Sequence, residues 1–324
     1  MGASVFISDP RIALTTAVSA WWLQATYPLA HAAYFANPAL QFARKPVPAP
    51  STVYVPTRHG LVRALVYAPS TADRSKAAQA GQRPPVHLVL HSGAFIVRMP
   101  EQEDNVARFL ASELGCFVLL PDYATAPGAC FPVAEQQVFD VFRWIRSQAT
   151  LRGWDGARIS VGGPSAGTKL ACNVVQQCLD EGIAGPVALT SEWGTVDLSR
   201  SDARRPSPIA TPVVTPALLT LVRDSYFAGC DLTDPLVSPY YDHRLDRFPP
   251  TLVVTAQHDA LRSEMHEFAE ALAAQGVEVT YHEVAGVDHG FTHMLPAEPA
   301  REALTLMAAH LHWAYAVARV RHAA

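Results

Sequence analysis

The segment that most constrains the fold of this chain is a β-branched stretch that runs directly into a turn of small residues. Residues 158–162 lead into Gly163-Pro164-Ser165-Ala166-Gly167, a Gly-x-Ser-x-Gly pattern, and a helix-forming stretch follows. This order is typical of a nucleophile elbow, a sharp strand-to-helix turn that lifts a serine hydroxyl above the edge of a sheet. A chance turn of small residues is the alternative, and the rest of the sequence decides between the two.

The composition predicts a protein with a large buried core and no nucleic-acid partner. Of the 324 residues, 49% are hydrophobic and 17% are charged, which suits one large α/β domain or two small ones. The net charge is −4, and a cluster such as Arg204-Arg205 is too short to form a basic patch. Neither nucleic acid nor an anionic membrane is therefore expected as a partner.

The cysteines indicate the redox environment of the chain. Their number is odd and no Cys-x-x-Cys pair occurs, which argues against a disulfide framework and against a zinc site. We therefore expect buried free thiols, no metal, and a cytoplasmic location in preference to secretion. The five residues are Cys116, Cys130, Cys172, Cys178 and Cys230.

The first fifty residues differ in character from the rest of the chain. Residues 12–30 are apolar but diluted by polar residues, which favours a mature amphipathic helix over a secretory signal. No run of about twenty uninterrupted apolar residues occurs, so we expect no stable membrane insertion. Three prolines between positions 46 and 50 predict a linker. The sequence thus divides into a helical segment, residues 1–50, and an α/β domain, residues 51–324.

Strand-like and helix-like stretches alternate through the α/β domain. This alternation predicts a mostly parallel sheet with helices on both faces, with catalytic groups on loops at the carboxyl ends of the strands. Residues 71–82 predict an exposed loop, and the proline-rich residues 199–215 predict an insertion. The strands expected from apolar runs are residues 86–90, 116–120, 159–162, 187–190 and 252–255, and residues 277–284 alternate as a further strand.

Two residues beyond the elbow stand where they could activate its serine. A serine hydroxyl is a weak nucleophile and needs an adjacent base. Asp259 follows the strand predicted at residues 252–255, and His289 follows the strand that ends at residue 284. The order serine, acid, histidine is that of an α/β-hydrolase. We predict that His289 accepts the proton of Ser165 and that Asp259 orients the imidazole and stabilises the imidazolium.

Each of these residues has a simpler interpretation when it is taken alone. Asp259 could cap a helix, and His289 could be a structural histidine in a loop or in the core. Asp288 is a rival acid, but it is adjacent in sequence to His289 and therefore poorly placed to orient the ring. His258 and His293 are rival bases without the matching context. The combined order of the three residues favours the catalytic interpretation.

A loop earlier in the chain has the composition of an oxyanion hole. His91-Ser92-Gly93-Ala94 follows the strand predicted at residues 86–90, where the oxyanion loop of this arrangement belongs. Gly93 would let the backbone approach the substrate closely. We predict that the N–H groups of Gly93, Ala94 and Ala166 stabilise the oxyanion of a tetrahedral intermediate. An ordinary strand-to-loop turn is the alternative.

In these motifs the chain resembles the hormone-sensitive-lipase-like esterases of the α/β-hydrolase fold. The resemblance covers roughly residue 53 to the C-terminus, and the motifs occur in the family's order. They are the loop at His91, Pro121-Asp122-Tyr123-Ala124-Thr125-Ala126-Pro127 with Phe131-Pro132, Trp154-Asp155 with Arg158, Asp234-Pro235-Leu236-Val237-Ser238-Pro239, Asp259-Ala260-Leu261-Arg262 and His289-Gly290-Phe291.

The resemblance implies an activity and a further structural layer. The implied reaction is hydrolysis of carboxylic esters through an acyl-enzyme, without a metal or a cofactor. The implied layer is a helical cap above the active site, to which residues 1–50 and about 199–227 would contribute. Residues 51–324 would then form the catalytic α/β-hydrolase domain. Family members often dimerise, so the resemblance is compatible with a homodimer.

Two positions depart from the family pattern. Ser92 replaces the first glycine of the usual His-Gly-Gly-Gly, but the two residues after it, which would donate to the oxyanion, keep their places. Pro164 replaces the acidic residue that usually precedes the nucleophile. Proline is tolerated at the end of a strand, whereas the loss of a carboxylate changes the local electrostatics.

The sequence says least about the substrate. Trp193 and Phe291 are our candidates for lining a substrate pocket, and plain packing is the alternative for both. We expect a serine carboxylesterase that hydrolyses short- to medium-chain acyl esters. An amidase or deacetylase with the same triad is the alternative enzyme, and a non-catalytic small-molecule receptor on the same fold is the alternative from another class.

Overall fold

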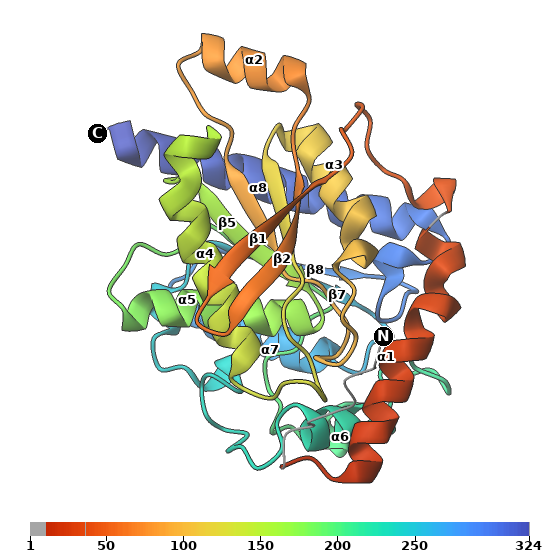
Figure 1. The fold of residues 1–324 in the computed structure, drawn as a ribbon. Coiled ribbons are helices and arrows are strands. Elements are labelled where there is room, and N and C mark those ends of the chain that lie inside the picture. The colour runs from red at the N-terminus through yellow and green to blue at the C-terminus, as the bar shows by residue number, and fades with distance from the viewer. Residues whose placement is uncertain (1–10, 36, 324) are drawn as a thin grey trace, which may run out of the picture.

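Within residues 11–35 and 37–323, which the computed structural model describes, eight strands form a single sheet (Figure 1). The spatial order of the strands is β1-β2-β4-β3-β5-β6-β7-β8. The strands are β1 (Ser51–Thr57), β2 (Gly60–Tyr67), β3 (Val86–Val89), β4 (Phe117–Pro121), β5 (Ile159–Pro164), β6 (Leu189–Glu192), β7 (Thr251–Ala256) and β8 (Val279–Val284).

The sheet is parallel except at one edge. β2 runs antiparallel to both β1 and β4, and every pairing from β4 across to β8 is parallel. β5 is central, because Val161 is in register with Leu88 of β3 on one side and Leu189 of β6 on the other. The mostly parallel sheet predicted from the alternating elements is confirmed. The carboxyl ends of β5, β7 and β8 consequently share one edge.

Helices cover both faces of the sheet, as the sequence predicts. One hydrophobic cluster packs α4, α5 and α7 on one face, and a second packs α3 and α8 on the other. Figure 1 shows α8 behind the strands. The helices of the described residues are α1 (Leu14–Phe35), α2 (Thr71–Gln79), α3 (Asp104–Leu114), α4 (Val133–Arg152), α5 (Ala166–Asp180), α6 (Pro216–Ser225), α7 (Arg262–Ala274) and α8 (Ala297–Ala323).

The residue pattern of each element follows from its surroundings. All six residues of β5 are buried, because the strand has neighbours on both edges and helices on both faces. It therefore reads as a run of small and apolar residues and not as an alternation. In α8, Leu304, Met307 and Leu311 are buried at spacings of three and four, which is the pattern of a helix with one face against the core.

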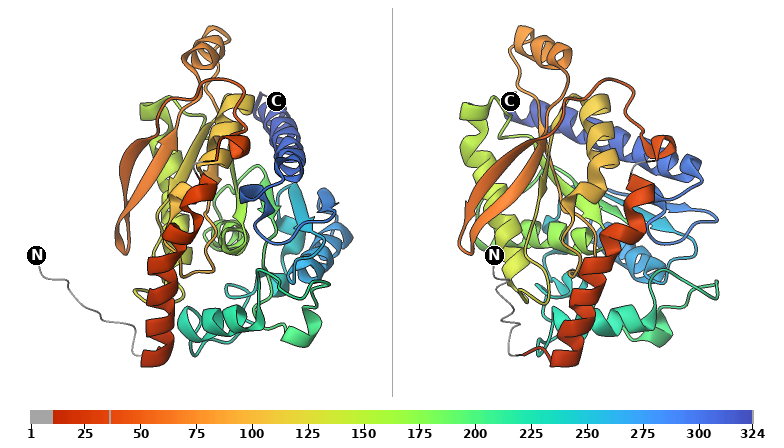
Figure 2. Two further views of the ribbon diagram at one scale, coloured as in Figure 1. Left: turned by 90° about the vertical axis from the view of Figure 1, so that its right-hand side faces the viewer. Right: turned by 45° about the vertical axis from the view of Figure 1, so that its right-hand side comes forward.

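Two helices form a separate layer beside the carboxyl ends of the strands. α1 packs against α6, and both views in Figure 2 show α1 on the outside of the molecule. Gln24 of α1 donates hydrogen bonds to the Ile96 carbonyl oxygen (2.9 Å) and to Thr125 Oγ1 (3.1 Å). These bonds fix α1 to the loops that follow β3 and β4. Residues 1–10 of the predicted N-terminal segment lie outside the described residues.

One expectation about the fold is wrong. Residues 71–82 were predicted as a loop, but Thr71–Gln79 form α2. Ser70 caps this helix, since its side chain accepts a hydrogen bond from the Asp73 N–H, and the alanines that follow favour helix. No residue of α2 is buried, which is why no apolar periodicity announced it. None of the described helices is long and apolar enough to span a membrane.

Candidate active site

The elbow predicted at Ser165 has the backbone of a sharp turn. β5 ends at Pro164, α5 begins at Ala166, and Ser165 between them has a φ of 52°. Positive φ is unfavourable for a residue with a Cβ, and strain of this kind concentrates at functional sites. A Cβ on Gly163 or on Gly167 would collide with the Leu90 carbonyl oxygen. The two glycines are therefore required, because strand, helix and the end of β3 meet here.

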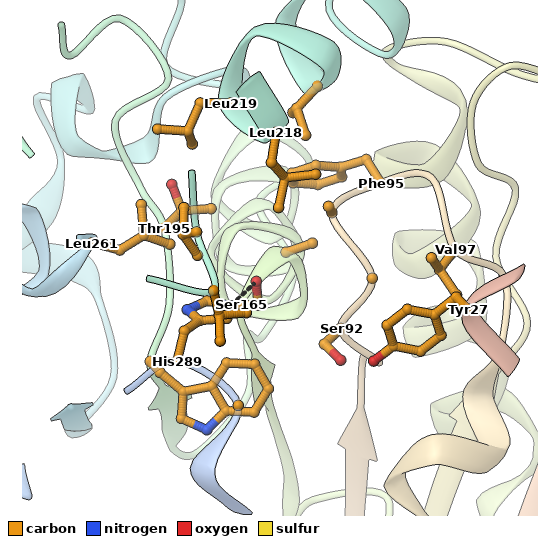
Figure 3. A pocket seen from close by; sticks show the side chains of 18 of the residues that line it. Tyr27, Ser92, Phe95, Val97, Ser165, Thr195, Leu218, Leu219, Leu261 and His289 are labelled. Atoms are coloured by element: carbon orange, nitrogen blue, oxygen red, sulfur yellow. Dashed lines mark hydrogen bonds between the residues drawn. The ribbon is translucent and has the colours of Figure 1, made fainter. Parts of the chain in front are cut away.

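The structure brings Ser165, His289 and Asp259 together. His289 Nε2 lies 2.9 Å from Ser165 Oγ (Figure 3). His289 Nδ1 lies 2.8 Å from Asp259 Oδ2. With Nδ1 protonated and donating to the carboxylate, Nε2 is free to accept the hydroxyl proton of Ser165. The Leu261 N–H donates to the other carboxylate oxygen at 2.9 Å. Asp259 thus shapes a turn and contacts the histidine at the same time.

The rival acid and the rival bases do not take the places of Asp259 and His289. Asp288 accepts hydrogen bonds from the N–H groups of His289 (2.7 Å) and Val213 (2.8 Å), so its carboxylate organises backbone and not the imidazole. His293 Nε2 lies 3.0 Å from a carboxylate oxygen of Glu103. His258 is not among the residues that line the pocket in front of Ser165.

A second serine–histidine contact lies inside the sheet. His87 Nδ1 of β3 is 2.7 Å from Ser160 Oγ of β5, and Ser160 Oγ is 2.5 Å from the Tyr315 hydroxyl of α8. Burial, with a smaller contribution from His310, lowers the pKa of His87 to about 3, so its ring is neutral. Neither residue of this pair lines the pocket. We therefore assign the pair to the packing of the sheet against α8.

The loop after β3, residues 91–97 (hereafter loop 91–97), borders the same pocket as Ser165. Gly93 has a φ of 117° and Ala94 a φ of 55°. A Cβ on Gly93 would lie 2.6 Å from the Val97 carbonyl oxygen, so the tight turn needs glycine there. Ala166 is the first residue of α5, where N–H groups have no partner within the helix. The N–H groups predicted as oxyanion donors thus belong to residues that surround the serine.

The pocket in front of Ser165 has a volume of about 270 Å³ and mostly apolar walls (Figure 3). Its walls come from α1, loop 91–97, the elbow, α6 and the loop that carries His289. The lining residues are Leu23, Tyr27, Ser92, Gly93, Ala94, Phe95, Val97, Ser165, Ala166, Trp193, Thr195, Leu198, Val213, Val214, Leu218, Leu219, Val222, Leu261, His289, Gly290, His293 and Met294.

Tyr27 and Thr195 are among the lining residues that the sequence reasoning missed. Tyr27 lies four residues after Leu23, so their helical spacing could have placed both on the same face of α1. Thr195 follows β6 in a stretch with no recognisable motif. No sequence signal indicated its place in the pocket.

The two substrate-pocket candidates lie in different places. Trp193 lines the pocket, has a φ of 37°, and presents its ring edge-on to His289 at a centroid distance of 4.7 Å. Phe291 does not line the pocket and lies instead in the hydrophobic cluster beneath it. This placement corrects the expectation for Phe291. The 3-10 turn of Phe291–His293 directs its ring into the core.

Glu192, at the end of β6, is a buried acid next to the elbow. Its carbonyl oxygen accepts the Ser165 N–H at 3.0 Å, whereas its side chain is almost fully buried. Burial, and then the charge of Glu103, raise the pKa of Glu192 to about 8. Its carboxyl group is therefore protonated at neutral pH.

Within the described residues, no group of three or more His, Cys, Asp or Glu could hold a metal ion.

Comparison with known proteins gives consistent matches. A family model described as the alpha/beta hydrolase fold matches residues 87–293. The chain is 27% identical to Esterase LipI of Mycobacterium tuberculosis over 239 residues, which are 73% of this chain and 72% of the relative. It is 28% identical to Carboxylesterase NlhH of the same organism over 225 residues, 67% of this chain and 69% of the relative.

A solved structure matches most of the chain. It is an esterase of Pyrobaculum calidifontis, with a TM-score of 0.80 and 28% sequence identity, and the match covers 90% of this chain and 92% of that one.

Proposed function

We propose that Ser165, His289 and Asp259 are the catalytic residues of this protein. The chain belongs to the hormone-sensitive-lipase-like esterases of the alpha/beta hydrolase fold. The protein is a serine carboxylic ester hydrolase. The contacts of 2.9 Å and 2.8 Å that link these three side chains at the wall of an apolar pocket carry the proposal.

In the first half of the reaction, Ser165 Oγ attacks the ester carbonyl carbon and His289 Nε2 takes the hydroxyl proton. Asp259 holds the imidazole by Nδ1 and stabilises the imidazolium that forms. The N–H groups of Gly93, Ala94 and Ala166 donate to the new oxyanion. One such donor is typically worth a factor of about 10²–10³ in rate.

In the second half, the tetrahedral intermediate collapses to an acyl-enzyme. His289 gives its proton to the leaving alkoxide, so the alcohol departs neutral. A water molecule then loses a proton to His289 and attacks the acyl carbon. The ester bond to Ser165 breaks, and the proton on His289 returns to Ser165 Oγ. His289 thus takes up and returns each proton that moves in this cycle.

We propose that the substrates are short- to medium-chain acyl esters. The pocket volume of about 270 Å³ lies just below the roughly 300–1,000 Å³ typical of sites for drug-sized ligands. The walls are supplied largely by leucine and valine, which suits an aliphatic acyl group. Leu218, Leu219 and Val222 of α6 and Leu23 of α1 border this space. α1 and α6 would therefore act as the cap, with residues 1–50 and about 199–227 contributing to it.

The proposal is tested by hydrolysis of p-nitrophenyl esters from acetate to palmitate, with Ser165→Ala beside the wild type. We expect serine-dependent turnover that peaks at short to medium chains. Turnover that rises steadily to palmitate would contradict the chain-length proposal. A matched amide series separates the esterase from an amidase, since an amidase would hydrolyse both. Wild-type turnover that Ser165→Ala retains would contradict the proposed nucleophile.

We also propose an oligomeric state and a cellular location for the protein. β8 is an edge strand with mostly half-buried side chains, and an open edge offers unpaired N–H and C=O groups to a second copy. A homodimer is therefore expected, and light scattering after gel filtration would test it. All five cysteines are free, and four are buried, which supports a location in the reducing cytoplasm.

A further inference from the structure

Glu103 is a fully buried carboxylate beneath loop 91–97. It is the last residue of the 3-10 turn Pro100–Glu103 and precedes α3. Its Oε1 accepts hydrogen bonds from the Ser92 N–H (3.0 Å) and from Ser92 Oγ (3.1 Å). Ser92 is the residue that replaces the usual glycine, so the added hydroxyl has a dedicated partner.

The second carboxylate oxygen faces another loop, residues 287–294 (hereafter loop 287–294), which carries His289. Glu103 Oε2 lies 3.0 Å from His293 Nε2. His293 Nδ1 is 3.0 Å from Thr292 Oγ1, and this contact holds the ring with Nε2 on the side of Glu103. One carboxylate thus contacts both loops, one oxygen for each.

The residues beside Glu103 repeat the same link. Gln102 donates a hydrogen bond to the Ser92 carbonyl oxygen (3.0 Å), and Asn105 donates to the Thr292 carbonyl oxygen (3.1 Å). Trp193 contacts both histidines of loop 287–294 edge-on, with centroid distances of 4.7 Å to His289 and 6.0 Å to His293. Figure 3 shows Ser92 across the pocket from Ser165 and His289.

The charge of Glu103 agrees with this arrangement. Burial raises the pKa of Glu103, but His293, the Ser92 N–H and His91 outweigh burial and hold it below its usual value. The group is therefore a carboxylate at neutral pH, which accepts hydrogen bonds from Ser92 of loop 91–97 and pairs with His293 of loop 287–294. A charged acceptor makes stronger hydrogen bonds than a neutral one.

We propose that Glu103 is a positioning residue that ties loop 91–97 to loop 287–294 and so sets the oxyanion donors against Ser165 and His289. The inference rests on the proposed catalytic residues. Loss of the tie lets Gly93 and Ala94 drift relative to the reacting carbonyl, which weakens stabilisation of the transition state more than binding of the substrate. The family departure at Ser92 would then be part of a device particular to this chain.

The test compares kinetics with the affinity of an aliphatic trifluoromethyl ketone. Ser165 Oγ adds to the carbonyl carbon of such a ketone while His289 takes the hydroxyl proton, and the resulting oxyanion occupies the proposed hole. The variants are Glu103→Leu, which removes both acceptors, and Glu103→Gln, whose amide oxygen can still accept from Ser92. Ser160→Ala is the matched control, because it deletes a buried polar group away from the pocket.

We expect Glu103→Leu to lower kcat about 10- to 100-fold with KM within about threefold. The inhibition constant of the ketone should rise by the same factor as kcat/KM falls. Glu103→Gln should restore kcat to within about threefold of the wild type, and Ser160→Ala should change neither quantity. A purely structural role would lower the melting temperature without moving the inhibition constant.

Folded Glu103→Leu with unchanged kcat and inhibition constant would overturn the proposal, and so would a loss of kcat with the inhibition constant unmoved. If Glu103→Leu does not fold, His293→Phe keeps a ring against Trp193 and removes Nε2. It should lower kcat and ketone affinity by the same factor, about three- to tenfold, and no change would overturn the proposal. A wild type that the ketone does not inhibit would instead refute the proposed nucleophile.

Discussion

Two serine–histidine contacts of similar length lie in different parts of this molecule. His289 Nε2 is 2.9 Å from Ser165 Oγ at the edge of the sheet, and His87 Nδ1 is 2.7 Å from Ser160 Oγ within it. Ser165 and Ser160 belong to the elbow and to the strand that leads into it, only five residues apart. The hydrogen bond alone therefore does not distinguish a nucleophile from a packing contact.

The two contacts differ in access and in the third partner. Ser165 and His289 are 8% and 7% exposed and border a pocket, whereas Ser160 and His87 are 0% and 1% exposed and border none of it. The histidine at the edge contacts a carboxylate that can stabilise an imidazolium, but the inner pair ends at the neutral hydroxyl of Tyr315. A catalytic histidine needs a partner that stabilises its protonated form, and it needs a substrate within reach.

The two serine–histidine pairs should differ most in how kcat responds when the serine hydroxyl of each pair is deleted. Ser165→Ala should lower kcat for a p-nitrophenyl ester by at least about 10⁴-fold, because no other group can form the acyl-enzyme. Ser160→Ala should keep kcat within twofold, roughly, because Ser160 does not reach the pocket. Initial rates of the two purified proteins give the comparison. A comparable loss in both variants would remove the distinction.

Exchange of each third partner should have the next largest effect. Asp259→Asn keeps the size of the side chain but disfavours the tautomer in which Nε2 accepts, so kcat should fall roughly 10³-fold. Tyr315→Phe deletes the hydroxyl at the other end of the inner pair and should leave kcat nearly unchanged. Steady-state kinetics on both variants checks this. Asp259→Asn with wild-type kcat would assign Asp259 to the turn alone.

The buried histidine should make the protein sensitive to acid. The pKa of His87 is about 3 when folded and near its ordinary value of 6.5 when unfolded, so the unfolded state binds the extra proton first. Its contribution to stability is complete above pH 6.5 and is lost as the pH falls toward 3. Between pH 6.5 and pH 5 the loss is about 2 kcal/mol.

His87→Gln removes this titration while keeping a polar side chain. Urea unfolding at pH 6.5 and pH 5 should show a smaller fall in the free energy of unfolding for the variant than for the wild type. All other groups titrate in both proteins, so the difference isolates His87. Equal falls would indicate that His87 is not held neutral in the folded state.

Glu192 should give the free energy of unfolding the opposite dependence on pH, with a smaller change between pH 7 and pH 8. Burial raises its pKa from 4.5 to about 8, so the folded state holds a proton that the unfolded state releases. Stability therefore falls as the pH rises from 4.5 to 8, by roughly 1 kcal/mol between pH 7 and pH 8. Glu192→Gln should lose less stability than the wild type over this interval. A steeper fall in the variant would contradict the protonated state.

The order of elements and the positions of the proposed catalytic residues were accessible from the sequence. Buried strands read as apolar runs, and Ser165, Asp259 and His289 each lie in the turn or loop after a predicted strand. Parallel strands bring their carboxyl ends to one edge, so adjacency in space follows from topology. Gly163 and Gly167 also had a steric meaning that the collision with the Leu90 carbonyl oxygen explains.

Other features depend on packing that no local pattern records. Phe291 lies next to the histidine motif in sequence, but the 3-10 turn that begins there directs its ring into the core. Glu103 has no motif around it, and its role emerges only where two distant loops meet. The helix α2 is stabilised by the Ser70 cap without burying any side chain, so hydrophobic periodicity could not reveal it.

The most direct measurement is the site of covalent labelling by a fluorophosphonate, located by peptide mass spectrometry. A fluorophosphonate reacts with a serine whose hydroxyl has an adjacent base and lies where the phosphorus atom of the probe can reach it. We predict stoichiometric labelling of Ser165, unchanged in Ser160→Ala and lost in Ser165→Ala. Labelling of Ser160, or of no serine in the folded wild-type protein, would contradict the assignment of Ser165 as the nucleophile.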